Sequence, residues 1–341
     1  MKLLITGCAG FIGMHVAERL LAAGHEVAGI DSLNDYYDVR LKEARLERLR
    51  RLPGYDFHRL DLADRQASAG LFASVRPQTV IHLAAQPGVR HSLNHPAAYI
   101  DANVVAFANV LEGCRQQGVG HLIFASSSSV YGGNTALPYR ETDNVDHPVS
   151  LYAATKKANE LMAHTYAHLY GLPCTGLRFF TVYGPWGRPD MAYWSFAEKI
   201  LAGEPIQVFN HGDMRRDFTY IDDIAEAVVR LIDHPACAEA GFDTARPDAA
   251  TSWAPWRIFN IGNHQPVALL DFIAELERAL GKPAIREMRP MQAGDVQATY
   301  ADTTRLAQLT GFAPATTLAT GIDRFVAWFL DWRARAATLT T

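Results

Sequence analysis

The sequence predicts an α/β fold built on a doubly wound parallel sheet, followed by a smaller mixed α/β region. Two observations predict it. Through the first half, short β-rich runs alternate with helical patterns, and a glycine-rich turn joins the first run to the first helix. Parallel sheets with helices on both faces are built in this way. Because such sheets bind ligands beyond the carboxyl ends of their strands, the residues directly after each strand are expected to form the site.

Strands and helices follow one another in alternation up to about residue 181. Strands are expected at residues 2–6, 26–31, 55–60, 79–83, 121–125 and 174–180. Helices are expected at residues 11–23, 41–52, 65–75, 96–117 and 151–170, and again at 269–280 and 318–332. The fourth of these helices opens on a proline, which suits a first turn where the missing N–H costs nothing.

Beyond residue 181 the pattern loosens, and the chain is expected to build a second region. Residues 243–255 are rich in Ala, Pro, Asp and Thr, which is the composition of an exposed loop. A nucleotide-binding domain is therefore expected at residues 1–180, rejoined by about residues 218–262. Residues 181–217 and 263–341 are expected to form a substrate-binding cap over the open end of the sheet.

The composition is that of an ordinary globular chain, with 341 residues, 49 % apolar and 20 % charged, and a net charge of −4. A mildly acidic surface is a poor counter-ion for nucleic acid or an anionic membrane, so neither is expected as a partner. No apolar run reaches the roughly 18 residues that a bilayer span needs. The four cysteines form no CxxC pair and the histidines show no metal-ligand spacing, so we expect no metal and a reducing, cytoplasmic location.

The glycine-rich turn from Thr6 to Gly13, TGCAGFIG, has the chemistry of a pyrophosphate-binding turn. A tight strand-to-helix turn needs residues without Cβ, here Gly7 and Gly10, so that backbone can approach the phosphates. Gly13 lets the helix pack on the sheet, with its N-terminal N–H groups and dipole facing the anion. The spacing is GxxGxxG rather than GxGxxG, and alone it leaves open a turn without a ligand. The strand before it and the helix after it favour a dinucleotide and a Rossmann-type sheet.

Two acidic residues end the next two strands. Asp31 comes 18 residues after Gly13, where an acidic residue meets an adenosine ribose. A carboxylate there accepts from both ribose hydroxyls and repels a 2′-phosphate, which favours NAD over NADP. Asp61 ends the third strand and has two interpretations of equal weight: a contact to the adenine amino group, or the N-cap of the following helix.

A tyrosine, a lysine and a run of serines make up the candidate catalytic group. Tyr152 and Lys156 lie four residues apart on one helix face. Neither is a base at neutral pH alone, because their ordinary pKa values are about 10 and 10.4. A nearby ammonium and a positive nicotinamide lower the tyrosine's pKa, which makes Tyr152 a candidate general base for a substrate hydroxyl. Ser126 to Ser129 follow an apolar strand, where they either line the ligand or satisfy local backbone groups.

As a set, these motifs resemble the extended short-chain dehydrogenase/reductase family. The resemblance is carried by TGCAGFIG, Asp31, HLAA at 82–85, the serine strand, YAATK at 152–156 and RDF at 216–218, with a similar segment at 294–302. Three stretches resemble in particular the UDP-glucuronate 4-epimerases: NDYYD at 34–38, VDHP at 145–148 and YGPWGRP at 183–189.

The resemblance implies tightly bound NAD, with Tyr152 as base, Lys156 on the nicotinamide ribose and Ser127 aligning the sugar 4-hydroxyl. Ser127 lies 25 residues before Tyr152, the family's separation, and Ser128 and Ser129 are the alternatives. The implied cofactor contacts, apart from Tyr152 and Lys156, are Gly7, Gly10, Phe11, Ile12, Gly13, Asp31, Asn34, Asp61, Leu62, Leu83, Ala84, Ala85, Gln86, Asn103 and Ser126. The implied contacts of the UDP-sugar, beyond the catalytic residues, are Thr181, Arg216 at the diphosphate and Asp295 at the uridine ribose.

The serine run also bears on the reaction. Family dehydratases and decarboxylases carry an Asp-Glu pair or a Glu before the Val-Tyr-Gly segment, where this chain has Ser128 and Ser129. A hydroxyl is a poor acid or base at neutral pH, so elimination is disfavoured. The expected reaction is oxidation of a UDP-sugar at C4, rotation of the 4-keto sugar and return of the hydride. The favoured case is UDP-glucuronate to UDP-galacturonate.

The carboxylate of UDP-glucuronate needs a cationic partner. Arg188 and Arg90 are the candidates, because a guanidinium binds a carboxylate in a fork. For Arg90 a structural salt bridge is an equal alternative, and Arg188 is equally suited to the diphosphate. Relatives acting on UDP-galactose often have an arginine three residues before Asp295, where this chain has Gln292.

Other functions stay open on the sequence alone. They are a UDP-glucose or UDP-N-acetylglucosamine 4-epimerase, an oxidoreductase that releases NADH, and a non-catalytic NAD-binding regulator. The presence of Tyr152, Lys156 and Ser127 argues against the last. The resemblance also implies a homodimer, formed through a four-helix contact of residues 96–117 and 151–170.

Overall fold

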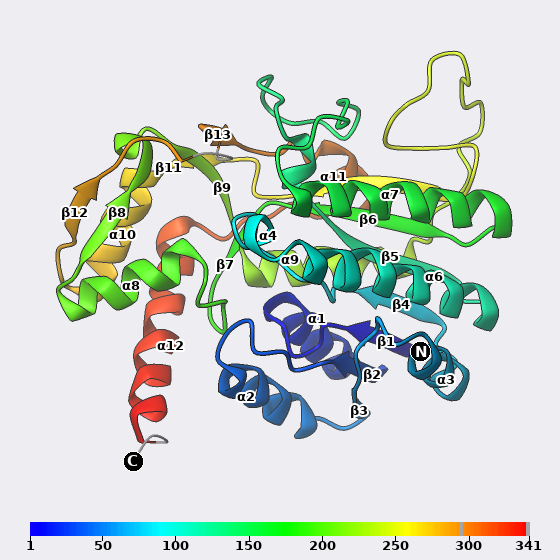
Figure 1. The fold of residues 1–341 in the computed structure, drawn as a ribbon, viewed down its shortest axis with the longest axis horizontal. Coiled ribbons are helices and arrows are strands. Elements are labelled where there is room, and N and C mark those ends of the chain that lie inside the picture. The colour runs from blue at the N-terminus through cyan, green and yellow to red at the C-terminus, as the bar shows by residue number, and fades with distance from the viewer. Residues whose placement is uncertain (293–295, 339–341) are drawn as a thin grey trace.

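The computed structural model describes residues 1–292 and 296–338. Seven strands form its central sheet: β1 (Lys2–Thr6), β2 (Glu26–Asp31), β3 (Tyr55–Arg59), β4 (Thr79–His82), β5 (His121–Ser127), β6 (Cys174–Phe179) and β10 (Trp256–Ile261). Their order is β10-β6-β5-β4-β1-β2-β3, and all neighbouring pairs are parallel (Figure 1). The order reverses between β1 and β4, the point at which open parallel sheets bind dinucleotides. The expected doubly wound sheet is confirmed.

Helices cover both faces of this sheet. On one face α1 (Phe11–Ala22) packs against α9 (Ile221–Arg230), and on the other α6 (Ala106–Gln117) packs between α3 (Arg65–Val75) and α7 (Leu151–Tyr170). Helix α2 (Val39–Arg50) contacts α1 and β3. Successive side chains of β1 point to opposite faces of the sheet. Leu3 and Ile5 therefore join the apolar cluster on one face, and Leu4 joins the cluster on the other.

The second region carries smaller sheets. In one of them β9 (Arg215–Tyr220) pairs with β7 (Thr181–Tyr183), β11 (Pro266–Ala268) and β13 (Ala298–Thr299). In another, β8 (Pro205–Val208) pairs with β12 (Ile285–Met288). Its helices are α8 (Ala192–Ala202), α10 (Leu269–Leu280), α11 (Thr304–Thr310) and α12 (Leu318–Thr338). The chain returns to the large sheet through β10 between β9 and β11. The expected domain limits at 180/181, 217/218 and 262/263 stay a prediction.

The expected helix at residues 96–117 is not one regular helix. After α4 (His91–Asn94) the chain forms α5 (Pro96–Tyr99), a π-helical segment (Ile100–Val105) and then α6. Single turns of π-helix are frequent at functional sites. Short 3₁₀ turns lie at Ser128–Tyr131, Phe209–Gly212 and Leu231–Asp233.

The expected loop at residues 243–255 is exposed over much of its length but is anchored by three buried residues and one ion pair. Ala250, Ser252 and Ala254 are buried, and Asp248 forms an ion pair of 2.6 Å with Arg305. These contacts tie the loop to α11 and to the end of the sheet. No described helix is both long enough and apolar enough to cross a membrane.

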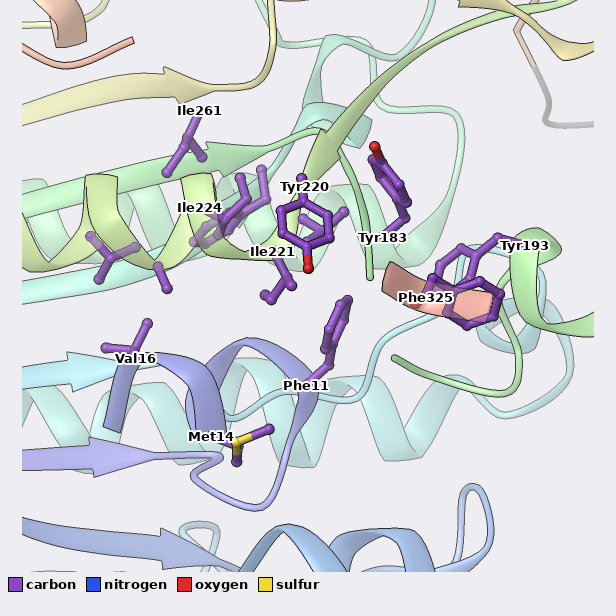
Figure 2. Close-up of a cluster of buried hydrophobic side chains, with 14 of the residues drawn as sticks. Phe11, Met14, Val16, Tyr183, Tyr193, Tyr220, Ile221, Ile224, Ile261 and Phe325 are labelled. Atoms are coloured by element: carbon purple, nitrogen blue, oxygen red, sulfur yellow. The ribbon is translucent and has the colours of Figure 1, made fainter. Parts of the chain in front are cut away.

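One apolar core continues from the large sheet into the second region. Figure 2 shows Phe11 of α1 pointing toward Tyr220 and Ile221, which lie where β9 runs into α9; Met14 of α1 belongs to the same cluster. The same cluster reaches Tyr183, Tyr193 and Phe325 on β7, α8 and α12. The loop of residues 184–191, which joins β7 to α8, is therefore attached at both ends to this core.

Candidate active site

A cleft, here the main cleft, opens at the carboxyl ends of the large sheet's strands. Its lining comes from the segments after β1 to β5, from α7 and from the loop at 184–191. Most of the residues expected at the cofactor or at the reacting sugar line it: Gly7, Gly10, Phe11, Ile12, Gly13, Asp31, Asn34, Asp61, Leu62, Leu83, Ala84, Ala85, Ser126, Ser127, Tyr152, Lys156 and Arg188.

The glycine turn has no room for a side chain at its three glycines. Gly7 has φ +71°, and a Cβ added to Gly13 would lie 2.1 Å from the Gly7 carbonyl oxygen. A Cβ on Gly10 would lie 2.9 Å from the same oxygen. Helix α1 begins directly after this turn, so its N-terminal N–H groups face the cleft. Close backbone and a helix N-terminus together fit the diphosphate of a dinucleotide.

Asp31 is held at the rim of the main cleft by two backbone donors. Its Oδ2 accepts from Ala9 N at 3.2 Å, and its Oδ1 accepts from Leu33 N at 2.9 Å. The fixed carboxylate fits an adenosine ribose. Asp61 also lines the cleft, but the N-cap interpretation is wrong, because Asp64 caps α3 by accepting from Ala67 N.

Lys42 is a lining residue that the sequence did not reveal. Its Nζ is buried and donates to the backbone oxygen and to Oδ1 of Asn34, at 2.9 and 2.6 Å. Burial lowers the pKa of Lys42, and Asp31 opposes that shift. A lysine on an amphipathic helix is ordinarily solvent-exposed, so its position in α2 carried no signal. Other lining residues outside the expected set include Ser32, Tyr36, Tyr37, Pro87, Ala102, Phe179, Phe180, Val182 and Met191.

Tyr152 and Lys156 both lie in the main cleft, where burial shifts the pKa of each. Lys156 is buried, donates to Ala125 O at 2.9 Å, and has its pKa lowered by burial to about 8. Burial raises the pKa of Tyr152, while a hydrogen bond with Ser127 and the charge of Arg188 lower it less strongly. Burial is the largest cause of the shift in the chain by itself, and the expected lowering of the tyrosine's pKa by Lys156 together with a positive nicotinamide stays a prediction.

The serine run divides between two cavities. Ser127 lines the main cleft with Tyr152, whereas Ser128 and Ser129 line a second cavity together with Thr181 and Arg216. Ser127 Oγ donates to Ser129 Oγ at 3.1 Å and accepts from Ser129 N at 3.2 Å, so the two cavities adjoin there. Asp295, the residue expected at the uridine ribose, lies outside the described residues.

The two arginines proposed for a sugar carboxylate have different surroundings. Arg188, in the loop of residues 184–191 (the arginine loop), lines the main cleft and forms an ion pair of 2.6 Å with Asp190. Arg90 is exposed, with its guanidinium over the Phe209 ring at 5.4 Å, and lines neither cavity. Of the two, Arg188 has the position that a carboxylate near Tyr152 requires.

Gln86 and Asn103 lie behind the main cleft rather than on its surface. Asn103, in the π-helical segment, accepts from Gln86 N at 2.7 Å and donates to Thr155 Oγ1 at 3.0 Å. Thr155 lies on α7 between Tyr152 and Lys156. Asn103 therefore links the segment after β4 to the helix that carries both residues. Among the described residues there is no cluster of three His, Cys, Asp or Glu side chains suited to a metal.

Comparisons with known proteins agree with this geometry. The model of the NAD dependent epimerase/dehydratase family matches residues 3–244. A probable UDP-glucuronate 4-epimerase of Rhizobium meliloti is 49 % identical, with 99 % of each chain covered. The crystal structure of a Bacillus cereus UDP-glucuronic acid 4-epimerase with UDP-glucuronic acid and NAD superposes with a TM-score of 0.84 at 30 % identity, covering 97 % of this chain and 100 % of that one. A Thermotoga maritima UDP-glucose 4-epimerase with UDP-glucose also gives 0.84, at 29 % identity, covering 98 % and 100 %.

Proposed function

The chain belongs to the NAD dependent epimerase/dehydratase family, and we propose that it converts UDP-glucuronate to UDP-galacturonate by epimerisation at C4. Family membership confirms the expected NAD cofactor and the enzyme class, an isomerase of the UDP-glucuronate 4-epimerase type. The choice of sugar and the role of each residue are the proposed part.

One arrangement carries the proposal: Tyr152, Ser127 and Arg188 line a single cleft with the glycine turn. In this assignment Tyr152 is the base for the 4-hydroxyl, and Ser127 aligns that hydroxyl. Arg188 supplies the positive charge that a carboxylate on C5 requires and a neutral hydroxymethyl group does not. Arg216 and Thr181, in the adjoining second cavity, are assigned to the UDP diphosphate and to the sugar.

Bound NAD would supply the acceptor and donor of a hydride at C4 of the sugar, and the glycine turn, Asp31 and Lys156 would hold it in the main cleft. The chain's own residues move the proton and hold the substrate. Tyr152 Oη takes the proton of the 4-hydroxyl and gives it back, and Ser127 and Arg188 favour its phenolate form against burial. Lys156 is oriented by Ala125 O and is assigned to the nicotinamide ribose. Ser128 and Ser129 supply no acid or base for an elimination.

A neutral UDP-sugar is the second candidate substrate, and one observation favours it. The charge of Arg188 is already balanced by Asp190, so a carboxylate has to share that guanidinium. The Thermotoga maritima structure with UDP-glucose is also as similar in fold as the Bacillus cereus one.

Product analysis separates the two substrates. The purified protein is incubated separately with UDP-glucuronate, UDP-glucose and UDP-N-acetylglucosamine, and products are resolved by anion-exchange chromatography and proton NMR. UDP-galacturonate from the first alone is the expected result. Tyr152→Phe is expected to lower that turnover about 10²- to 10⁴-fold while NAD is retained. Turnover of only a neutral sugar contradicts the proposed substrate and keeps the mechanism.

We also propose that the protein is a homodimer. Helix α7 has three exposed apolar side chains, Leu161, Leu169 and Tyr170, at 58 %, 59 % and 51 % exposure. A second copy that packs α6 and α7 against the same helices would cover them. Light scattering after gel filtration is expected to give twice the chain's mass, and Leu161→Glu to shift it to the monomer. A monomeric wild-type protein contradicts the proposal.

A further inference from the structure

Arg45 is a buried arginine between two loops of the site. It projects from the inner face of α2, and its exposed fraction is 0 %. The partners that the structure gives it are neutral: the carbonyl oxygens of Ala9, Trp186 and Gly187, and the hydroxyl of Tyr37. Burying a guanidinium is costly unless its donors are satisfied, so these bonds explain how it is tolerated there.

The hydrogen bonds of Arg45 match the five N–H donors of a guanidinium. Nε donates to Trp186 O at 3.1 Å, and Nη2 donates to Trp186 O and Gly187 O, both at 2.7 Å. Nη1 donates to Ala9 O at 2.9 Å and to the Tyr37 hydroxyl at 2.6 Å. A lysine offers three donors from one point and cannot span two loops in this way.

The two loops that Arg45 joins carry different parts of the site. Ala9 lies in the glycine turn, where its N–H donates to Asp31 and its carbonyl accepts from Arg45. Trp186 and Gly187 directly precede Arg188, which lines the same cleft as Tyr152. One side chain thus connects the cofactor-binding turn to the arginine loop.

The backbone of the arginine loop is held in place from outside. Trp186 has φ +61°, a left-handed conformation that a bulky residue keeps only when its surroundings impose it. His15 on α1 provides a second anchor through its Nε2, 3.1 Å from Pro185 O. Burial lowers the pKa of His15 to about 3, so the ring is neutral and Nε2–H donates to that carbonyl.

We propose that Arg45 is a positioning residue, which sets Arg188 against the cofactor-binding turn and so holds a carboxylated sugar in register with the cofactor. The inference rests on the proposed function, because it assigns the substrate carboxylate to Arg188. Without Arg45 the arginine loop loosens, and the hold on the carboxylate weakens. Loss of such a hold raises KM more than it lowers kcat.

A loosened carboxylate has a second chemical consequence. The 4-keto sugar is a β-keto acid, which loses CO₂ when its C5–C6 bond stands perpendicular to the carbonyl. The C5–C6 bond then breaks and releases CO₂, its electron pair enters the enolate of the C4 ketone, and a proton from water adds at C5. The result is a UDP-4-keto-pentose, and return of the hydride removed from C4 reduces this ketone to a UDP-pentose. A UDP-pentose product therefore reports loss of control over that bond.

The test compares Arg45→Lys with Arg51→Met. Arg51 directly follows α2, is exposed and pairs with Glu47. Arg51→Met therefore removes a guanidinium near the same helix without touching the arginine loop. For Arg45→Lys we expect KM for UDP-glucuronate to rise about tenfold, faster amide hydrogen exchange confined to residues 184–191, and a UDP-pentose by mass spectrometry. Arg51→Met is expected to match the wild type in all three.

A second variant covers the case in which Arg45→Lys does not fold. His15→Leu keeps Arg45 and removes the bond to Pro185, and is expected to change the same quantities in the same direction, by less. The proposal is overturned if Arg45→Lys and His15→Leu both keep the wild-type amide hydrogen exchange and the wild-type KM. It is also overturned if amide exchange becomes faster over the whole chain. If the wild type does not turn over UDP-glucuronate, the proposed function fails, and the exchange measurement still decides whether Arg45 holds the loop.

Discussion

Arg188 and Asp190 form an ion pair on the wall of the cleft that contains Tyr152. Arg188 Nε donates to Oδ1 of Asp190 at 3.0 Å, and Nη2 donates to Oδ2 at 2.6 Å. The Tyr36 hydroxyl donates to the same carboxylate at 3.3 Å. Although burial opposes it, Arg188 lowers the pKa of Asp190 and keeps the carboxylate charged. The guanidinium therefore has a fixed orientation in the cleft that Tyr152 also lines.

This orientation predicts a change of product when Arg188 is lost. In the proposed function a fixed cation keeps the C5–C6 bond of the 4-keto sugar near the carbonyl plane. Arg188→Ala is expected to lower epimerisation and to release some UDP-pentose, measured by mass spectrometry of the reaction mixture. Reduced activity without any pentose would show that Arg188 does not control that bond.

The crowding around Gly13 predicts a double defect for Gly13→Ala. A new Cβ would lie 2.1 Å from the Gly7 carbonyl oxygen, so the glycine turn has to shift. We expect the free energy of unfolding to fall by about 1–3 kcal/mol and the bound NAD to be lost. The measurements are urea denaturation and the NAD content of the purified protein.

Gly70→Ala is the matched control for that variant. Gly70 lies in α3 with open space around its Cβ position. The substitution is expected to leave NAD content unchanged and to stabilise the protein by up to about 1 kcal/mol, because alanine has the higher helix propensity. If Gly13→Ala and Gly70→Ala had the same stability and the same NAD content, the assignment of the glycine turn to NAD binding would be contradicted.

A buried ion pair behind the serine run predicts a large loss of stability for Glu160→Gln. Glu160 accepts from Arg178 Nε at 2.9 Å and Nη2 at 3.0 Å, and from Ser126 Oγ at 2.6 Å. Both charged side chains are at most 2 % exposed. Removing one partner leaves the Arg178 charge buried and unbalanced, which costs about 3–5 kcal/mol in the free energy of unfolding.

Urea denaturation tests this with two comparisons. Glu47→Gln breaks an exposed pair with Arg51 and is expected to change stability by less than about 0.5 kcal/mol. The double variant Glu160→Met with Arg178→Met removes both charges and is expected to lose less stability than Glu160→Gln. If Glu160→Gln lowered the free energy of unfolding by less than about 1 kcal/mol, the charge of Arg178 would not depend on Glu160 for its stabilisation.

The lowered pKa of Lys156 predicts a pH dependence of stability in the NAD-free protein. Its pKa falls from an ordinary 10.5 to about 8 in the folded state, so between these values the unfolded chain binds more protons. The resulting cost, at most about 3 kcal/mol, is present in full below pH 8 and disappears as pH rises toward 10.5. The unfolding free energy of the wild type is therefore expected to rise from pH 7 to pH 10 relative to Lys156→Met. A difference independent of pH would contradict the shift.

Much of the main cleft could be predicted from the sequence because it depends on local patterns. The glycine turn, Asp31, the serine run and the Tyr152–Lys156 pair each lie within a few residues of a recognisable strand end or on one helix. In a parallel sheet all strand ends meet at one edge, so alternation of strands and helices was enough to bring these residues together.

The sequence could not predict which of several neighbouring residues of the same chemical type lines the main cleft. Ser127 lines the main cleft whereas Ser128 and Ser129 line the second cavity, because the chain turns into a 3₁₀ segment at that point. The sequence made Asp61 a candidate cap for the helix after β3, whereas the backbone path places Asp64 at that position.

By itself, the sequence determined the doubly wound sheet, the glycine turn and the chemical types available at each strand end, since period and composition are local properties. Only the tertiary structure decided that Arg188 rather than Arg90 lines the main cleft, that burial raises the pKa of Tyr152, and that Arg45 joins Ala9 to Trp186. These depend on segments about 140 residues apart coming into contact, and on how much water each group loses there, which no local pattern encodes.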